Sequence, residues 1–367
     1  MKILTVVGAR PQFIKAAAVS RVIKQDYASQ VDEILVHTGQ HFDDNMSKVF
    51  FEELDIPKPK YNLEISGGHH GLMTGRMLEA IESVLLDERP DYVLVYGDTN
   101  STLAGALAAA KLHIPVAHVE AGLRSFNMRM PEEINRILTD RVSSLLFCPT
   151  GTAVDNLARE GVSDGVYNVG DVMYDVALYY RDQAAVHSSA IQSLGVKPKD
   201  YVLATCHRAE NTDDKNRLKE ILLALSQIAQ ETAVVFPLHP RTRKLINEYG
   251  LEYLTKDLTV TPPLPFLDMV ALEQSATVIL TDSGGVQKEA FFYRVPCITM
   301  RDETEWVETV RMGWNKLVGA SAKNIIKEVI GLLRKSPDEV SDSPYGYGDS
   351  SQKIIKILLN HEVSLRK

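Results

Sequence analysis

The sequence has few cysteines, no long apolar run and no concentrated basic segment. Its 367 residues include three cysteines, which lie far apart and each within or at the end of an apolar run: Cys148, Cys206 and Cys297. Cysteines of this kind are typical of reduced, buried thiols, so we expect neither disulfides nor a cysteine metal site. The apolar runs all fall short of the roughly 18 to 20 residues that a membrane-spanning helix needs.

The charge of the chain argues against two classes of partner. The formal net charge is -8, and lysines and arginines form no run. Nucleic acid and anionic membrane surfaces both require a concentrated basic patch, so we expect neither as a partner, and an anionic ligand must be met by local groups. Residues 1–8 hold one lysine and a short apolar run, which predicts a first strand rather than a signal peptide. We therefore expect a cytoplasmic protein.

Short apolar runs alternate with helical patterns along the chain, which is typical of buried parallel strands in α/β proteins. The runs form two sets, at 3–7, 33–36, 92–96, 116–119 and 145–148, and at 201–205, 233–236, 258–260, 277–280 and 297–300. The length also favours two domains, each with its own core. We predict an α/β domain at 1–170, a second at 171–348, a cleft between them, and a C-terminal helix within 349–367 that packs back on the first domain.

The run at 277–280 is followed by a segment that could bind phosphate. Ser283, Gly284 and Gly285 precede a helical pattern, so free backbone N–H groups would lie at the positive end of the helix dipole with little side chain to exclude an anion. Glu289, about one turn inside, could reach ribose hydroxyls. The inferred ligand is a nucleoside diphosphate that carries another group. An ordinary strand-to-helix turn is the alternative.

Polar residues follow several other strands, where ligands of open parallel sheets bind. Arg10 and Lys15 follow the first strand, although cations are disfavoured at a helix start, which favours a functional role. Asp98 and Asn100 follow the strand at 92–96, where helix capping is the simpler interpretation. Glu120 ends the next strand and is a better catalytic candidate, because a buried carboxylate needs a partner.

Glu132 and Arg136 lie in the pattern of one helix, four residues apart, so they face the same way. A carboxylate held by an arginine is a reasonable proton handler. Acids in a first helical turn also complement the helix dipole without any chemistry, and this alternative stays open.

Histidines follow two strands of the second set. His207 and His239 hold equivalent positions and could serve in acid–base chemistry or contact a diphosphate. A third polar cluster contains His37, Gln40 and His41. Zinc is an alternative ligand, but no paired histidine or cysteine spacing supports it.

Taken together, these motifs resemble the non-hydrolysing UDP-N-acetylglucosamine 2-epimerases over nearly the whole chain. The motifs that carry the resemblance are Gly-Ala-Arg-Pro-Gln-Phe-Ile-Lys at 8–15, Thr-Gly-Gln-His at 38–41, Gly-Asp-Thr at 97–99, His-Val-Glu-Ala-Gly-Leu-Arg at 118–124, Pro-Glu-Glu at 131–133, Asn-Arg at 135–136, His-Arg-Ala-Glu-Asn at 207–211 and Thr-Asp-Ser-Gly-Gly-Val-Gln at 281–287. The resemblance implies two Rossmann-like domains of the GT-B type, a homodimer, a UDP-sugar substrate and no metal or nicotinamide cofactor.

The resemblance also implies a mechanism and residue roles. A base removes the C2 proton while UDP leaves C1, and the 2-acetamidoglucal is reprotonated on its other face as UDP re-adds. The implied catalytic set is Asp98, Glu120, Glu132, His207, Lys15 and Arg136. The set implied to bind UDP is Arg10, His239, Ser283, Gly284, Gly285 and Glu289.

The chain departs from the family pattern in two places. Trp306 and Val307 stand where the common pattern has arginine and proline, and the loop between Glu120 and Glu132 is shorter and carries Arg129. Both departures resemble the subgroup that acts on UDP-2,3-diacetamido-2,3-dideoxy-glucuronic acid for bacterial O-antigen or capsule. Arg129 is a candidate partner of the sugar carboxylate, or alternatively a solvated loop residue.

Four other functions stay open on the sequence. They are a UDP-N-acetylglucosamine 2-epimerase, a hydrolysing epimerase, a GT-B glycosyltransferase and a non-catalytic UDP-sugar sensor. A glycosyltransferase needs an acceptor groove rather than several acids around one sugar, so the acids favour epimerisation.

Overall fold

A computed structural model describes residues 1–40, 58–304, 306–334 and 343–361 of the chain. The chain divides into two compact units: unit 1 comprises Met1–Val176 and Ser343–Lys367, and unit 2 comprises Ala177–Asp342. The expected boundaries, at 170/171 and 348/349, would instead place the first turn of α7 (Val172–His187) in the second domain. That turn belongs to unit 1 because Asp175 accepts the backbone N–H groups of Ser350 and Ser351 at 3.1 and 2.7 Å.

Unit 1 is built around a parallel sheet. Its seven described strands have the order β3-β2-β1-β4-β5-β6-β7. They are β1 (Lys2–Val7), β2 (Asp32–His37), β3 (Tyr61–Asn62), β4 (Tyr92–Tyr96), β5 (Val116–Val119), β6 (Leu145–Cys148) and β7 (Val166–Asn168). The helices described around them are α1 (Arg10–Asp26), α3 (His70–Glu88), α4 (Asn100–Lys111), α5 (Pro131–Val142), α6 (Gly151–Arg159) and α16 (Ser350–Asn360).

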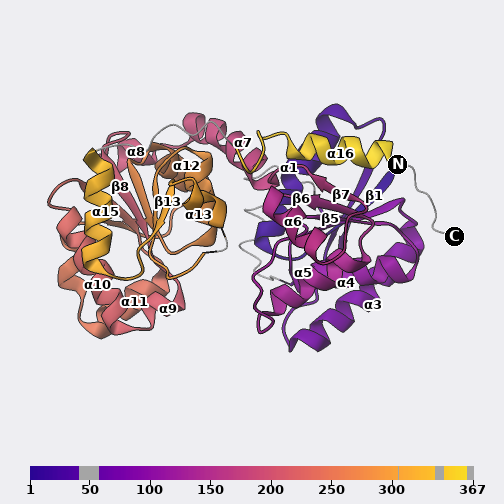
Figure 1. Cartoon of the computed structure of the whole chain (residues 1–367), viewed down its shortest axis with the longest axis horizontal. Helices are drawn as coiled ribbons and strands as arrows, with labels where there is room; N and C mark the ends of the chain where they lie inside the picture. The colour runs from indigo at the N-terminus through magenta and orange to yellow at the C-terminus, as the bar shows by residue number, and fades with distance from the viewer. Residues whose placement is uncertain (41–57, 305, 335–342, 362–367) are drawn as a thin grey trace. The chain divides into compact units, whose positions relative to one another are not determined.

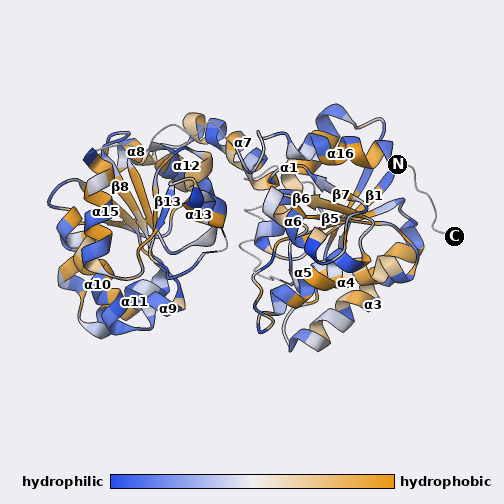
Figure 2. Cartoon of the chain, viewed as in Figure 1, coloured by the Kyte–Doolittle hydropathy of each residue, from blue (hydrophilic) through white to orange (hydrophobic). Residues whose placement is uncertain are grey.

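Helices cover both faces of this sheet (Figure 1). α3 and α4 cover one face, where Leu4 and Val6 of β1 pack with Met77, Ile81 and Ala104. α16 packs against α1, so the C-terminal helix lies on unit 1. Because both faces are covered, the central strands are mostly apolar, as Figure 2 shows.

Unit 2 repeats the design with a second parallel sheet. In its described part, six strands have the order β10-β9-β8-β11-β12-β13. They are β8 (Tyr201–Thr205), β9 (Ala233–Pro237), β10 (Thr259–Thr261), β11 (Val278–Thr281), β12 (Cys297–Thr299) and β13 (Asn315–Leu317). The helices described are α8 (Ala190–Ser193), α9 (Ala209–Thr212), α10 (Lys215–Ile228), α11 (Pro240–Tyr249), α12 (Phe266–Ser275), α13 (Gly284–Phe292), α14 (Val307–Arg311) and α15 (Ala322–Arg334), with the 3₁₀ turn η1 (Glu252–Thr255).

The core of unit 2 lies on both faces of its sheet. Leu218 and Ile221 of α10 and Val329 of α15 pack on one face, and Leu272 of α12 and Ala290 of α13 pack on the other. The predicted fold class, two α/β domains with parallel sheets, is confirmed. The three cysteines are buried, as expected.

The strand orders identify where ligands should bind. In unit 1 the order reverses between β1 and β4, and in unit 2 it reverses between β8 and β11. In open parallel sheets, ligands bind outside the carboxyl ends of the strands at such reversals. The loops that follow these strands are therefore the expected places for a ligand. None of the helices described has the length and apolar character to cross a membrane.

Candidate functional site

Two neighbouring strands of unit 1 end in residues with left-handed backbone conformations. Gly97 follows β4 with φ of 64°, and Glu120 follows β5 with φ of 69°. The left-handed region is uncommon for a residue other than glycine, so the backbone at Glu120 is strained. The Gly97 N–H donates to the Val119 carbonyl at 2.9 Å, which joins the two strand ends.

Glu120 is buried and forms an ion pair with Lys15 of α1. The side chains of Glu120 and Lys15 are only 8% and 12% exposed. A carboxylate in such a place requires a cation, and Lys15 supplies it. A Cβ atom at Gly97 would lie 3.3 Å from Glu120 Oε2 and 3.7 Å from Lys15 Nζ, so the absence of a side chain there leaves the pair its space.

Asp98, the next residue, is bound by Arg136 of α5. Arg136 Nη2 lies 2.5 Å from Asp98 Oδ2, and Nη1 lies 2.8 Å from Glu133 Oε2. The expected pairing of Arg136 with Glu132 is therefore wrong, because the arginine turns to its other helical neighbour and to Asp98. Glu132 lies exposed in the first turn of α5.

Glu133, which was not among the predicted site residues, holds the loop before α5 through hydrogen bonds. Its carboxylate accepts the N–H groups of Ser125 and Phe126 at 2.9 and 2.8 Å. Burial would raise the pKa of Glu133, but these bonds, together with the Arg136 guanidinium, hold that pKa below its ordinary value. Its position in the first turn of α5 could have indicated a role for Glu133, but Glu132 lies in the same turn and the sequence does not distinguish the two.

Gln12 is a second residue that the sequence analysis did not select. Its Oε1 accepts the N–H groups of Gly8 and Ala9 at 2.8 and 3.0 Å, and its Nε2 donates to the Tyr96 carbonyl at 2.7 Å. Gln12 thus fastens the loop after β1 to the end of β4. Its position near Arg10 and Lys15 was visible in the sequence, but these hydrogen bonds were not.

In unit 2, α13 starts shortly after β11, as the prediction of a phosphate-binding helix start requires. Gly284 and Gly285 are its first two residues, and Ser283 is its N-cap. Among the described residues, the Ser283 side chain makes no capping hydrogen bond. The first-turn N–H groups of a helix have no intrahelical acceptor, so this end can receive an anion.

Asp282 fastens the loop after β8 to the start of α13. It is fully buried and accepts the N–H groups of His207 and Arg208 at 3.1 and 3.0 Å and the Asn211 amide at 3.2 Å. His207 Nδ1 lies 3.4 Å from Asp282 Oδ1, while the imidazole is 45% exposed. Asp282 belongs to the motif at 281–287 but was not among the predicted site residues. A carboxylate at the end of an apolar strand could have indicated its role.

Glu289 has an acidic neighbour in α12. Glu273 is buried, and burial first, then the charge of Glu289, raise its pKa well above the ordinary value. Glu273 is therefore a buried acid with a raised pKa beside Glu289, and no sequence pattern reveals this pairing.

The remaining predicted residues take simpler positions. Arg10 is the exposed first residue of α1. His239 caps α11, since its Nδ1 accepts the Arg241 N–H at 3.3 Å, and its ring centroid lies 6.4 Å from that of His207. Of the third polar cluster, Gln40 accepts the Ser101 hydroxyl at 2.7 Å, and His41 lies outside the described residues.

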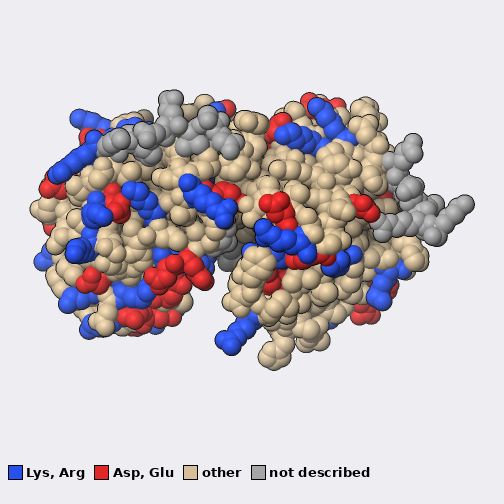
Figure 3. Space-filling view, in the orientation of Figure 1, with Lys and Arg blue, Asp and Glu red and all other residues tan. Residues whose placement is uncertain are grey.

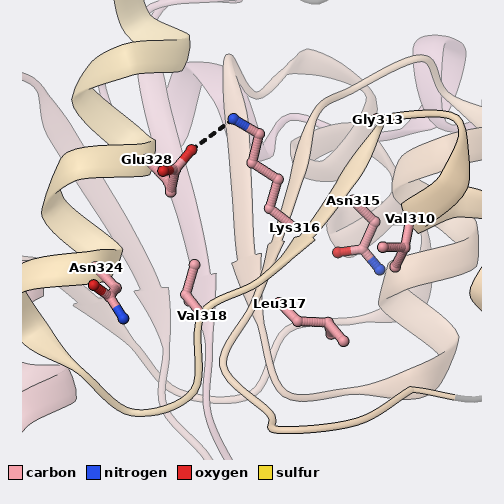
Figure 4. Close-up of a pocket in the computed structure, with 8 residues that line it drawn as sticks. All are labelled: Val310, Gly313, Asn315, Lys316, Leu317, Val318, Asn324 and Glu328. Carbon is pink, nitrogen blue, oxygen red and sulfur yellow. Dashed lines mark hydrogen bonds and ion pairs between the residues drawn. The ribbon is translucent and has the colours of Figure 1, made fainter.

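Three other features bear on the choice of site. The described residues contain no group of three or more His, Cys, Asp or Glu that could hold a metal ion. A pocket of about 580 Å³ lies at the edge strand β13, where Lys316 bonds Glu328 at 2.6 Å (Figure 4). The residues that line it include none of the candidate set, so we do not assign the activity there. On the face shown in Figure 3, acidic and basic side chains are interspersed.

The arrangement in unit 1, with acids at neighbouring strand ends held by separate cations, can move protons. The arrangement in unit 2 can hold an anion beside a histidine. A model of the UDP-N-acetylglucosamine 2-epimerase family matches residues 24–359. The chain belongs to this family.

One related protein and two solved structures illustrate the match. UDP-2,3-diacetamido-2,3-dideoxy-D-glucuronate 2-epimerase of Pseudomonas aeruginosa is 56% identical over 363 residues, which cover 98% of this chain and 99% of that protein. The crystal structure of UDP-GlcNAc 2-epimerase of Methanocaldococcus jannaschii with UDP-GlcNAc and UDP has a TM-score of 0.83 at 46% identity and covers 98% of this chain and 100% of that one. The Neisseria meningitidis UDP-GlcNAc 2-epimerase structure, bound to UDP-GlcNAc, has a TM-score of 0.84 at 32% identity, with the same coverage.

These matches confirm the resemblance inferred from the sequence. They also confirm the expected class of enzyme, an epimerase of UDP-sugars. The GT-B-like fold agrees with the solved structures of the family.

Proposed function

We propose that this epimerase acts on UDP-2,3-diacetamido-2,3-dideoxy-glucuronic acid without hydrolysing it, and converts the gluco to the manno configuration at C2. The observation that carries epimerisation is the pair of held carboxylates, Glu120 with Lys15 and Asp98 with Arg136, at adjacent strand ends. The choice of substrate is supported by the 56% identity to the Pseudomonas aeruginosa enzyme and by Trp306 and the shortened loop.

In the proposed reaction the C2–H and C1–O bonds break and a C1=C2 double bond forms. The proton passes to a carboxylate, the electron pair of the C1–O bond leaves with UDP, and the product is a 2-acetamidoglucal. UDP then re-adds at C1 while a proton is returned to the opposite face of C2. Because the C2 proton is weakly acidic, the barrier is lowered by a positioned acid and base and by stabilising the leaving diphosphate.

We assign the proton transfers to the acids of unit 1. Asp98, Glu120 and Glu132 handle the proton, and Lys15 and Arg136 hold Glu120 and Asp98 in place through ion pairs. The two candidate bases differ in surroundings, since Glu120 is 8% and Asp98 is 31% exposed. This difference fits separate roles as base and acid.

We assign the UDP moiety of the same substrate to unit 2. The first turn of α13, with Ser283, Gly284 and Gly285, holds the diphosphate, and Glu289 accepts from the ribose hydroxyls. His207, fixed by Asp282, donates to the departing diphosphate. Arg10 adds positive charge, and His239 lines the site.

The substrate assignment is tested by comparing kcat/KM for the diacetamido uronate with kcat/KM for UDP-N-acetylglucosamine. We expect a preference for the uronate of at least about 10-fold, the effect of one added interaction of ~1.4 kcal/mol. Arg129, exposed in the loop before α5, is the proposed partner of the sugar carboxylate. Arg129→Gln should lower kcat/KM for the uronate alone, whereas Arg76→Gln, at an exposed arginine of α3, should change neither substrate. A preference for UDP-N-acetylglucosamine would make that sugar the substrate.

We further propose that the enzyme is a cytoplasmic homodimer that supplies a bacterial surface polysaccharide. Dimerisation is supported by exposed apolar side chains in unit 1, among them Phe126 (74%), Met128 (61%) and Leu138 (42%). Light scattering of the purified protein tests the dimer, and Leu138→Glu should weaken it if α5 contributes. The cytoplasmic location and the role in surface polysaccharide synthesis stay predictions.

A further inference from the structure

His118 lies fully buried at the end of β5, and both of its ring nitrogens face oxygen atoms. Nε2 lies 2.7 Å from the Gly97 carbonyl, and Nδ1 lies 2.7 Å from Asp140 Oδ1. A carbonyl oxygen can only accept a hydrogen bond, so Nε2 must carry a proton. The state of Nδ1 depends on Asp140.

Asp140 is surrounded by donors and is ionised. Its Oδ2 lies 2.7 Å from Arg124 Nη1 and accepts the Gly122 N–H at 3.2 Å. These two donors, the Arg124 guanidinium and the Gly122 N–H, favour the carboxylate form of Asp140 without any contribution from the ring. Because an ionised carboxylate only accepts, Nδ1 of His118 also carries a proton. The ring is thus an imidazolium.

The other groups around this ring are compatible with its charge. Arg124 also pairs with Glu160, the C-cap residue of α6, at 2.7 Å, so two cations face two anions. On β6, burial raises the pKa of the Cys148 thiol to about 12, so it stays neutral. In a buried network of paired charges, loss of one partner leaves another charge without a hydrogen bond, which is energetically costly. Each of these side chains therefore limits the positions that the others can take.

The hydrogen bonds of His118 and Asp140 join three segments that carry the acids of unit 1. These segments are the loop after β4, the end of β5, and α5. Gly97 precedes Asp98, and it is bonded to β5 twice, through its carbonyl to His118 and through its N–H to Val119. Asp140 lies one turn after Arg136 on α5, and Arg136 binds Asp98. Asp140 also holds Gly122, two residues after Glu120.

We propose that His118 is a positioning residue that carries a proton on each ring nitrogen and sets Asp98 and Glu120 relative to each other for proton transfer at C2. This inference rests on the proposed function. Either neutral tautomer would turn a lone pair toward an oxygen atom and break one of the two contacts. His118 therefore acts through the carboxylates and exchanges no proton with the substrate.

The charge state is tested on the full chain with ¹⁵N-labelled histidine by NMR. A free imidazole is mostly neutral at about pH 7.5, because its pKa is about 6.5. At that pH we expect both ring nitrogens of His118 to be protonated, with the signal assigned by its loss in His118→Gln. A neutral tautomer would overturn the proposal, whatever the activity of the enzyme.

Two variants separate the contacts of the ring. Gln places its amide near the position of Nε2 and can bond Gly97, whereas Asn places its amide near the position of Nδ1 and can bond Asp140. We expect His118→Gln and His118→Asn each to lower kcat by about 10²-fold with KM and UDP affinity nearly unchanged, since small misplacements of reacting groups have effects of this size. Parental kcat in both would contradict the positioning role.

His361→Gln is the matched control. It removes a histidine contact in the same unit, between Nδ1 and the Tyr92 hydroxyl at 2.9 Å, without touching the acids. We expect it to keep kcat. A parent chain without any epimerase activity would refute the proposed function, and the NMR result would still decide the charge of His118.

Discussion

Glu120 has the burial, backbone strain and cationic partner expected of a residue held for chemistry. Its left-handed backbone stores strain, and its carboxylate is buried. Lys15 offsets the burial of its charge. The same residue is therefore poorly explained by stability and well explained by proton transfer.

Replacement of Glu120 by Gln tests this interpretation. Gln keeps the shape of the side chain but cannot accept a proton, so kcat should fall by about 10² to 10⁴-fold, the usual contribution of a general acid or base. UDP affinity, measured by calorimetry, should not change because the proposed UDP site is in unit 2. A variant with substantial turnover would remove Glu120 from the mechanism.

Gly97→Ala should disturb the Lys15–Glu120 pair. The added Cβ lies 3.3 Å from Glu120 Oε2, and φ of 64° disfavours alanine, so we expect a loss of about 1 kcal/mol in the free energy of unfolding and a lower kcat. Gly75→Ala, in an open position of α3, is the control and should raise stability by about 0.5–1 kcal/mol. Urea unfolding and initial rates measure both, and a Gly97→Ala enzyme with parental kcat would contradict the close packing inferred here.

At the residue scale, the sequence predicts which acids matter better than how they pair. Lys15 and Glu120 could be selected because they follow the ends of strands, whereas Asp98 was selected through the family resemblance, since its position alone favoured helix capping. The choice between Glu132 and Glu133 could not be made, because positions three and four apart are both neighbours on a helix. The roles of Gln12 and His118 depend on partners far away in the chain, which one sequence does not reveal.

At the scale of elements, Asp282 connects the loop after β8 with the start of α13. Asp282→Asn would turn an amide donor toward N–H groups, so we expect a loss of about 1–3 kcal/mol in stability together with a lower kcat through His207. Asp214→Asn, at the N-cap of α10, is the control, because Asn caps a helix as well as Asp does. Equal effects of the two substitutions on kcat would refute the special position of Asp282.

The contact between α12 and α13 predicts a pH dependence of stability. The folded chain keeps a proton on Glu273 above about pH 4.5, where the unfolded chain loses it, so folding stability falls as pH rises toward the raised pKa. Glu273→Gln holds no such proton, so its stability relative to the parent should increase with pH, by up to about 1.4 kcal/mol per pH unit. Urea unfolding at several pH values tests this, with Glu79→Gln, at an exposed acid of α3, as the control. A difference independent of pH would show that Glu273 is ionised in the folded chain.

Most elements could be predicted from the sequence, because buried parallel strands leave continuous apolar runs. The strands β3, β7 and β13 could not, since they have two or three residues each and lie at or next to the sheet edges. Edge strands of this length carry little hydrophobic pattern. The equally short edge strand β10 was predicted because Leu258 and Val260 supply an apolar signal.

At the scale of the whole molecule, the proposed chemistry is divided between the two units. Unit 1 contains acids paired with cations, and unit 2 contains the helix start that we propose to hold the diphosphate, in the same unit as His207. The chain passes from one unit to the other within α7 and returns before α16. The number of domains was predictable from length and alternation, but the place of crossing depends on Asp175 and its bonds to α16, which only the fold reveals.

The central claim is that one group removes the C2 proton and another returns a proton on the opposite face. It is tested most directly by proton NMR of the reaction in D2O with the diacetamido uronate, following the anomeric signals and the hydrogen at C2. The account predicts that the manno product forms with deuterium at C2, because the returning proton comes from a group that exchanges with solvent. A manno product that keeps its original hydrogen at C2 would contradict it.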